Sequence, residues 1–194
     1  YGIDVLKYFM LREFNFGSDG SFSMDKLVQR MNSDLSNDLG NLVSRTIQMV
    51  SKYRDGIVPE AKDENEIDKD LKEMASSCKS KVEDSIDKFA FNKALADIWA
   101  FISRTNKYID ETEPWVLAKD EENSGRLDTV LYNLIESIRI ISQLIEPFMH
   151  NTSKLINEQI SVEGFTWEDS ETFGLYKAGT KVERGENLFP RLDI

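Results

Sequence analysis

The sequence predicts an all-α protein: an antiparallel bundle of four or five helices with a short entry segment and an extended C-terminal arm. Two observations support this fold class. Apolar residues recur at three- and four-residue steps along several long segments, which is the spacing of one helix face. Glycine and proline interrupt these segments at Gly56, Pro59, Pro114 and Pro147, where helices end or bend.

The first two helices are expected at residues 3–14 and 24–53. Between them, the stretch "NFGSDGSFS" reads as a turn, and Ser23 is placed to cap the second helix. Within the second helix one apolar face is expected to be buried, and Gly56 follows the end of the run. The residues of that face are Leu35, Leu39, Leu42, Thr46 and Val50.

Four further helices are expected, at residues 67–86, 92–109, 124–146 and 152–159. The last twenty or so residues contain three glycines and a proline with no helical period, so they are expected to form an extended arm that follows a surface.

Composition limits the possible functions. The chain has 194 residues, enough for one domain with a smaller appended piece, and a net charge of −11. That charge argues against a protein that grips phosphate backbones, because such binding depends on Lys and Arg. No apolar run is long enough to span a membrane, so no membrane partner is expected. The chain opens on Tyr1 and shows no signal peptide, so we expect a piece of a longer protein.

The sequence offers no recognisable catalytic or metal centre. A single Cys and a single His cannot build a structural zinc site, which usually has four Cys or His ligands. Cys78 lies on an apolar stripe and is expected in the core. His150 is expected to be a surface or packing residue rather than a functional group, and no phosphate-binding glycine loop is present.

Asn41 and Arg45 are the first candidate binding residues. They lie one turn apart on the polar face of the second helix, where Gly40 and Asn41 are poor helix formers. One interpretation is a solvated surface. The other is a recognition pair, since Arg offers a fork of donors and Asn a donor and an acceptor that suit base edges.

Trp115, directly after Pro114, is the second candidate. Burial in the bundle is one interpretation of this side chain, because Trp is usually mostly buried. A stacking platform for an unpaired base is the other. By contrast, Trp99 lies on the apolar stripe of its helix and is expected in the core. Trp167 lies in a segment without helical periodicity, so the sequence does not predict whether it is buried.

Four motifs occur together in one order: "YGIDVLKYFMLREFNFGSDGSFS", "NSDLSNDLGNLVSRT", "NKYIDETEPWVLAKD" and "KAGTKVERGENLFPRLD". With these motifs the chain closely resembles the C-terminal half of bacterial methionyl-tRNA synthetases, over essentially its whole length. The resemblance implies three parts: residues 1–22 as the end of a stem-contact module, residues 23–172 as a helical anticodon-binding domain, and residues 173–194 as a peptide that returns toward the catalytic domain.

The same resemblance implies site roles. Asn41 and Arg45 match residues that read bases of the CAU anticodon, and Trp115 matches a tryptophan that stacks on an anticodon base, in a loop shaped by Pro114. Two further polar residues of "NKYID" match a neighbouring set near the anticodon. They are Asn106 and Asp110. On this interpretation Gly40 is small in order to keep the recognition face open.

For the full enzyme the resemblance implies a cytoplasmic ligase that uses ATP with Mg²⁺ to activate methionine and attach it to tRNA. That chemistry belongs to an N-terminal catalytic domain with "HIGH"-type and "KMSKS"-type signatures, which are absent here. The chain itself is therefore expected to bind the tRNA and its own catalytic domain, to hold no cofactor, and to catalyse nothing. The alternative is a helical scaffold or protein-docking domain with no RNA role.

Overall fold

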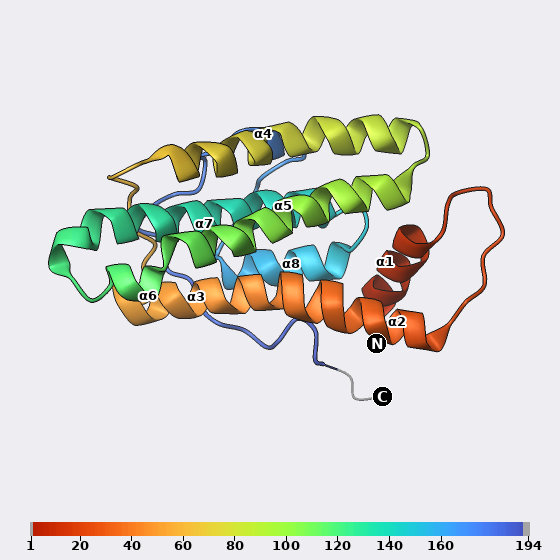
Figure 1. Cartoon of the computed structure of the whole chain (residues 1–194), viewed down its shortest axis with the longest axis horizontal. Helices are drawn as coiled ribbons and strands as arrows, with labels where there is room; N and C mark the ends of the chain where they lie inside the picture. Colours follow the sequence, from red (N-terminus) through yellow and green to blue (C-terminus); the bar gives the residue numbers. More distant parts are fainter. Residues whose placement is uncertain (1, 192–194) are drawn as a thin grey trace.

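The computed structural model describes residues 2–191 and confirms the all-α class (Figure 1). Tyr1 of the entry segment and residues 192–194 of the arm lie outside the described residues. The elements are α1 (Ile3–Glu13), α2 (Met24–Arg30), η1 (Met31–Gly40), α3 (Asn41–Arg54), α4 (Glu66–Asp87), α5 (Phe91–Thr112), α6 (Pro114–Leu117), η2 (Glu121–Asn123), α7 (Ser124–Ile145), α8 (His150–Gln159) and η3 (Glu168–Glu171).

Helix α7 is the centre of the bundle. It contacts α3, α4, α5, α6 and α8, and every residue from Leu127 to Ile145 is buried except Tyr132, which is half-buried. Figure 1 shows α7 behind α5, with α4 on one side and α8 on the other. A helix surrounded in this way must bury its polar side chains too, and the segments around α7 supply partners for several of them, including Asp128, Thr129 and Gln143.

The expected helix ends are present. Ser23 accepts a hydrogen bond from the Lys26 backbone N–H at 3.4 Å, as an N-cap residue does. A capping box that was not predicted, between Asn65 and Asp68, starts α4. At the end of α3, Asp55 is left-handed with φ 53°, and Gly56 follows with φ 80°.

The helix expected at 24–53 is continuous, but its middle is wider than expected. Residues 31–40 form the π-helical segment η1 between α2 and α3. The expected apolar face is buried throughout. A Cβ on Gly40 would lie 3.1 Å from Leu35 O, a carbonyl of the same π-helical segment, and 3.8 Å from the Phe189 ring, which is an ordinary contact distance. The absence of a side chain at Gly40 therefore relieves crowding within the helix itself, and its predicted effect on the recognition face stays a prediction.

The entry helix α1 is tied to the bundle at two points. Tyr8 Oη donates to Asp34 Oδ2 at 2.7 Å, and its ring lies 4.4 Å from that of Trp99, which is buried as predicted. Asp4 accepts from the backbone N–H and the hydroxyl of Thr152 in the first turn of α8. These contacts join the first helix to α5, α8 and η1.

The C-terminal arm does more than follow the surface, because it inserts apolar side chains into the core. Tyr176, Val182 and Phe189 are all buried. Its backbone also pairs with the stretch after α3: Val58 N–H donates to Thr180 O at 2.9 Å, and Gly179 N–H donates to Val58 O at 2.8 Å.

A fully buried ion pair on α7 holds the start of the arm. Glu136 accepts the backbone N–H groups of Gly174, Leu175 and Tyr176 at 2.6–3.2 Å. Arg139 donates to both Glu136 oxygens and to Thr172 O at 2.8 Å. Both side chains have no exposed area, so removing either would strand a buried charge.

Cys78 is buried, as predicted from its stripe. Burial, followed by the nearby Asp97 carboxylate, raises the pKa of its thiol to about 12. Among residues 2–191, no helix combines the length and apolar character of a membrane span.

The buried Glu136–Arg139 ion pair gives a stability prediction. Replacing Glu136 with Ala leaves the buried Arg139 without its carboxylate partner, and should lower the free energy of unfolding by about 3–5 kcal/mol. Glu183→Gln breaks an exposed pair with Lys181 and should change it by less than about 0.5 kcal/mol. Urea titration followed by circular dichroism measures both. Equal effects of the two substitutions would contradict the stabilising role of the Glu136–Arg139 ion pair.

Asp68 gives a pH prediction. Burial alone would raise the pKa of its carboxyl, but hydrogen bonds from Arg126, Tyr108 and the Asn65 N–H outweigh burial and hold the pKa below its usual value. The charged form therefore stabilises the fold above about pH 4, and this contribution is lost as the pH falls through the lowered pKa. Asp68→Asn should cost about 2 kcal/mol at pH 7. The gap between the urea midpoints of Asp68→Asn and of the unchanged chain should narrow as the pH falls from about 5 toward 3, and a constant gap would argue against this role.

Candidate nucleic-acid interface

A sharp turn at the end of α5 presents Trp115. Glu113 adopts a left-handed conformation with φ 43°, which ends α5, and Pro114 takes the first position of α6, where its missing N–H costs nothing. Pro114 is buried, while the Trp115 side chain that follows it is 40% exposed. The indole is therefore not sealed inside the bundle, and its role as a stacking platform stays a prediction.

Trp115 and Arg45, seventy positions apart in sequence, line the same open pocket of about 220 Å³. One face of α3 supplies the rest of the lining. The lining residues are Arg45, Gln48, Met49, Lys52, Tyr53 and Trp115. An indole, a phenol ring and a thioether give the pocket apolar walls, while a guanidinium, an amide and an ammonium group stand at its edges.

Arg45 is held only weakly. Its Nη2 lies 3.5 Å from Asp110 Oδ1, and the two side chains are 42% and 68% exposed. An exposed pair of this kind contributes at most about 1 kcal/mol. Asn41 is exposed one turn before Arg45, on the same polar side of α3, although it does not line the pocket. Both predicted recognition residues are therefore open to solvent.

Asn106 lies differently from the other candidates. It is half-buried, and its Nδ2 donates to the backbone carbonyl of Asp38 in η1 at 3.2 Å. Asp110 follows one turn later on α5 and is exposed. The structure therefore brings Arg45, Asp110 and Trp115 together at one end of the bundle, and places Asn106 between α5 and η1.

Sequence reasoning missed four lining residues: Gln48, Met49, Lys52 and Tyr53. A signal existed, since they follow Arg45 at the three- and four-residue steps that share a helix face. Lys52 Nζ lies 5.2 Å from the Tyr53 ring centroid, within the range of a cation–π contact. The pocket thus carries two cationic groups beside two aromatic rings.

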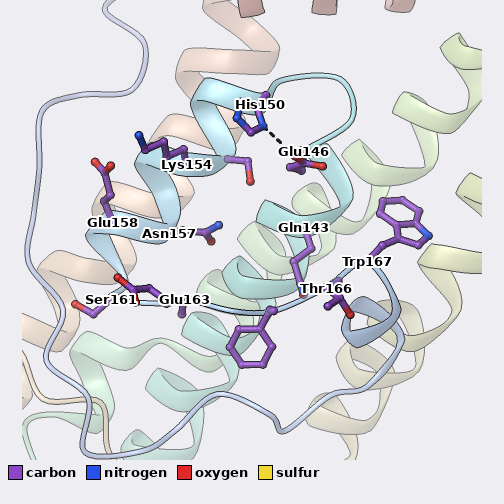
Figure 2. Close-up of a pocket in the computed structure, with 13 residues that line it drawn as sticks. Gln143, Glu146, His150, Lys154, Asn157, Glu158, Ser161, Glu163, Thr166 and Trp167 are labelled. Atoms are coloured by element: carbon purple, nitrogen blue, oxygen red, sulfur yellow. Dashed lines mark hydrogen bonds and ion pairs between the residues drawn. The ribbon is translucent and has the colours of Figure 1, made fainter.

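A larger groove of about 960 Å³ lies at the C-terminal end of α7, whereas α6 leads into the N-terminal start of that helix. Figure 2 shows it between α7, α8 and the loop that carries Glu163 and Thr166. His150 Nδ1 lies 2.9 Å from Glu146 Oε1, and the His150 side chain is 65% exposed, as a surface residue would be. Within residues 2–191, no three His, Cys, Asp or Glu side chains are grouped to hold a metal ion.

The scaffold interpretation called for a buried Trp115 and an Arg45 locked in a salt bridge. The indole is exposed, and the Arg45 pair is long and open to water. The geometry therefore favours a surface that takes planar, polar groups such as nucleobases over a purely structural face.

Comparison with known proteins identifies what this chain is similar to. A family model described as the anticodon binding domain of methionyl tRNA ligase matches residues 58–193, and one for class I tRNA synthetases (M) matches residues 1–47. The methionine–tRNA ligase of Caldanaerobacter subterraneus subsp. tengcongensis is 56% identical over the whole chain, and that of Clostridium tetani is 50% identical. The chain spans about a third of the length of these relatives, 31% and 30%.

Solved structures agree with the sequence comparisons. The apo form of Mycobacterium tuberculosis methionyl-tRNA synthetase matches all of this chain with a TM-score of 0.93 at 34% identity, and the chain covers 39% of it. A structure of the same enzyme bound by methionyl-adenylate matches 97% of this chain with a TM-score of 0.89, and 38% of that enzyme is covered. The similarity therefore extends over the whole fold.

The exposure of Trp115 gives a prediction that needs no ligand. Trp115→Ala should lower the free energy of unfolding by less than about 1 kcal/mol, as for a surface substitution. The matched control, Trp99→Ala, empties a buried site and should cost about 3–5 kcal/mol. Thermal or urea unfolding compares the two, and a larger loss for Trp115 would mean that the indole supports the fold rather than a surface.

Proposed function

Because the chain belongs to the anticodon-binding domain family of methionyl-tRNA ligases, we propose that it binds the CAU anticodon loop of the cognate tRNA. The observation that carries this proposal is the meeting of Arg45 and Trp115 at one open pocket. In the proposal, Trp115 stacks on an unpaired base, Pro114 fixes the turn that presents it, and Asn41 and Arg45 bond to base edges.

The newly found lining residues extend this assignment. Tyr53 and Met49 supply apolar area against which a base can pack, and Gln48 offers both a donor and an acceptor at the pocket edge. Lys52 is exposed beside them and is suited to a phosphate oxygen. Asn106 and Asp110 complete the polar set on α5.

A net charge of −11 is compatible with this function. Anticodon loops are single-stranded, so stacking and base-edge hydrogen bonds can carry recognition, with each stacked base worth about 1–3 kcal/mol. Further phosphate contacts would come from the rest of the whole protein. This division of labour explains why an acidic domain can still select an RNA loop.

For the whole protein we propose a cytoplasmic methionine–tRNA ligase that consumes ATP with Mg²⁺. Its catalytic domain would be the partner of residues 1–22 and 173–194, the stem-contact and returning segments, with residues 23–172 as the anticodon-binding domain. No residue of this chain is assigned to ATP, Mg²⁺ or methionine. The chain alone is expected to bind RNA without turnover.

Arg45→Ala should weaken binding of a CAU stem-loop by about 1–3 kcal/mol, the usual value of one side-chain contact to a base edge. Lys154→Ala, which removes an exposed cation from the groove at the opposite end of α7, should leave affinity nearly unchanged. Titration at one fixed salt concentration measures both. Unchanged affinity in the Arg45 variant would remove this residue from the site.

Binding should also change the fluorescence of Trp115. A CAU stem-loop should quench it, since a nucleobase stacked directly on the indole quenches its excited state, and a scrambled loop should not. Trp115→Phe serves as the control, because it keeps a stacking ring and leaves only the signals of Trp99 and Trp167. Quenching that survives in this variant would place the base elsewhere.

A further inference from the structure

Two side chains of α5 bond to backbone carbonyls of the π-helical segment η1. Trp99 Nε1 donates to Asp34 O at 3.1 Å, and Asn106 Nδ2 donates to Asp38 O at 3.2 Å. The two donors lie seven residues apart, which puts them on the same face of α5 two turns apart. Their acceptors lie four residues apart along η1. One face of α5 thus contacts η1 at two levels.

The Asn106 bond falls where the helix changes its winding. The Asn41 backbone N–H is shared between Ser36 O, five residues back, and Asp38 O, three residues back. Asp38 O therefore accepts from both Asn41 N–H and Asn106 Nδ2. From Asn41 onward the helix is α-helical. The Asn106 amide therefore bonds to Asp38 O, the same carbonyl that accepts the backbone N–H of Asn41, a proposed base-binding residue.

The winding of η1 sets the direction in which Asn41 and Arg45 point. An α-helix turns by 100° per residue, and a π-helix, with more residues per turn, turns by less. Moving the end of the π segment by one residue would therefore rotate Asn41 and Arg45 together about the helix axis. Such a rotation would change the position of Arg45 relative to Asp110 and Trp115, both of which are positioned by α5 and the turn after it.

The opposite end of η1 is held independently. Asp34 accepts from Tyr8 Oη at 2.7 Å and from Arg30 Nη1 at 3.1 Å, and its carbonyl is bonded to Trp99. Leu35 and Leu39 are fully buried between the two ends. A change of hydrogen-bond register at the C-terminal end of η1 would move Asn41 and Arg45, which follow it directly. Asn106 is bonded at that end.

We propose that Asn106 is a positioning residue, whose amide fixes the change from π- to α-helix at Gly40–Asn41 and so keeps Asn41 and Arg45 aligned with Trp115. This inference rests on the proposed anticodon function and assigns Asn106 a role other than direct contact with a base. The half-buried amide acts on the RNA through the backbone of Asn41.

The test uses Asn106→Ala and Asn106→Asp, neither of which can donate to Asp38 O, with Lys107→Ala, an exposed neighbour on α5, as the control. Hydrogen exchange of the free chain needs no RNA. Loss of one hydrogen bond should speed exchange of the amides at 37–42 by about fivefold to tenfold. Exchange within residues 46–54 should stay unchanged, and Lys107→Ala should alter neither region.

Stem-loop affinities then separate positioning from base contact. If Asn106 acts through Asn41 and Arg45, adding Asn106→Ala to the double variant Asn41→Ala/Arg45→Ala should weaken binding of the CAU loop by no more than about twofold. Unchanged exchange at 37–42, or a loss in that background as large as the loss caused by Asn106→Ala in the unchanged chain, would overturn the inference. Failure of the unchanged chain to prefer CAU over a scrambled loop would overturn the proposed function, and the site role of Asn106 with it.

Discussion

The structure depends on one constraint: α7 is buried on all sides and still carries polar side chains. A buried polar group without a partner costs about 1–3 kcal/mol, so the segments around α7 must supply partners. Thr129 accepts the backbone N–H groups of Lys62 and Asp63, and Ser142 donates to Asn157 Oδ1. Gln143 donates to Thr166 O. Loops that have no helical period of their own are therefore placed by their bonds to α7.

The same constraint places the candidate site. Arg54, the last residue of α3, donates to Asp128 on α7 and to the Ser124 carbonyl at 3.2 Å. These bonds hold the C-terminal end of α3 against the N-terminal end of α7. Helix α6 leads into that same end of α7 and carries Trp115. The pocket between Trp115 and Tyr53, the neighbour of Arg54, is a consequence of this junction.

The sequence was sufficient to predict the helices because a stable amphipathic helix must repeat its apolar residues at 3.6-residue spacing. It could not predict η1. Leu27 at the end of α2 and Met31, Leu35 and Leu39 in η1 recur every four residues, a spacing that in an α-helix drifts by about 40° per step. That drift is a weak signal of wider winding. The bonds from α5 that stabilise the wide turn depend on tertiary packing, which no local pattern reports.

The site was partly predictable for a related reason. Arg45 and Asn41 could be placed on a polar face from spacing alone, whereas the exposure of Trp115 depends on the left-handed Glu113 and the direction in which α6 leaves α5. Composition favours a buried tryptophan, and the family resemblance was needed to expect a stacking role. The Glu136–Arg139 pair was not predicted at all, because a Glu and an Arg three apart usually form a surface pair.

The weak contact between Arg45 and Asp110 fits a domain that must select an RNA loop while carrying excess negative charge. The exposed pair is worth at most about 1 kcal/mol, and a good bidentate base contact about 1–3 kcal/mol, so a correctly placed base edge can replace the carboxylate. A phosphate that approaches Arg45 meets Asp110 as well, and like charges repel. In the proposed function, Asp110 would leave the guanidinium free to bond to a neutral base edge while disfavouring a phosphate at the same place, so the acidity of the domain would contribute to its selectivity.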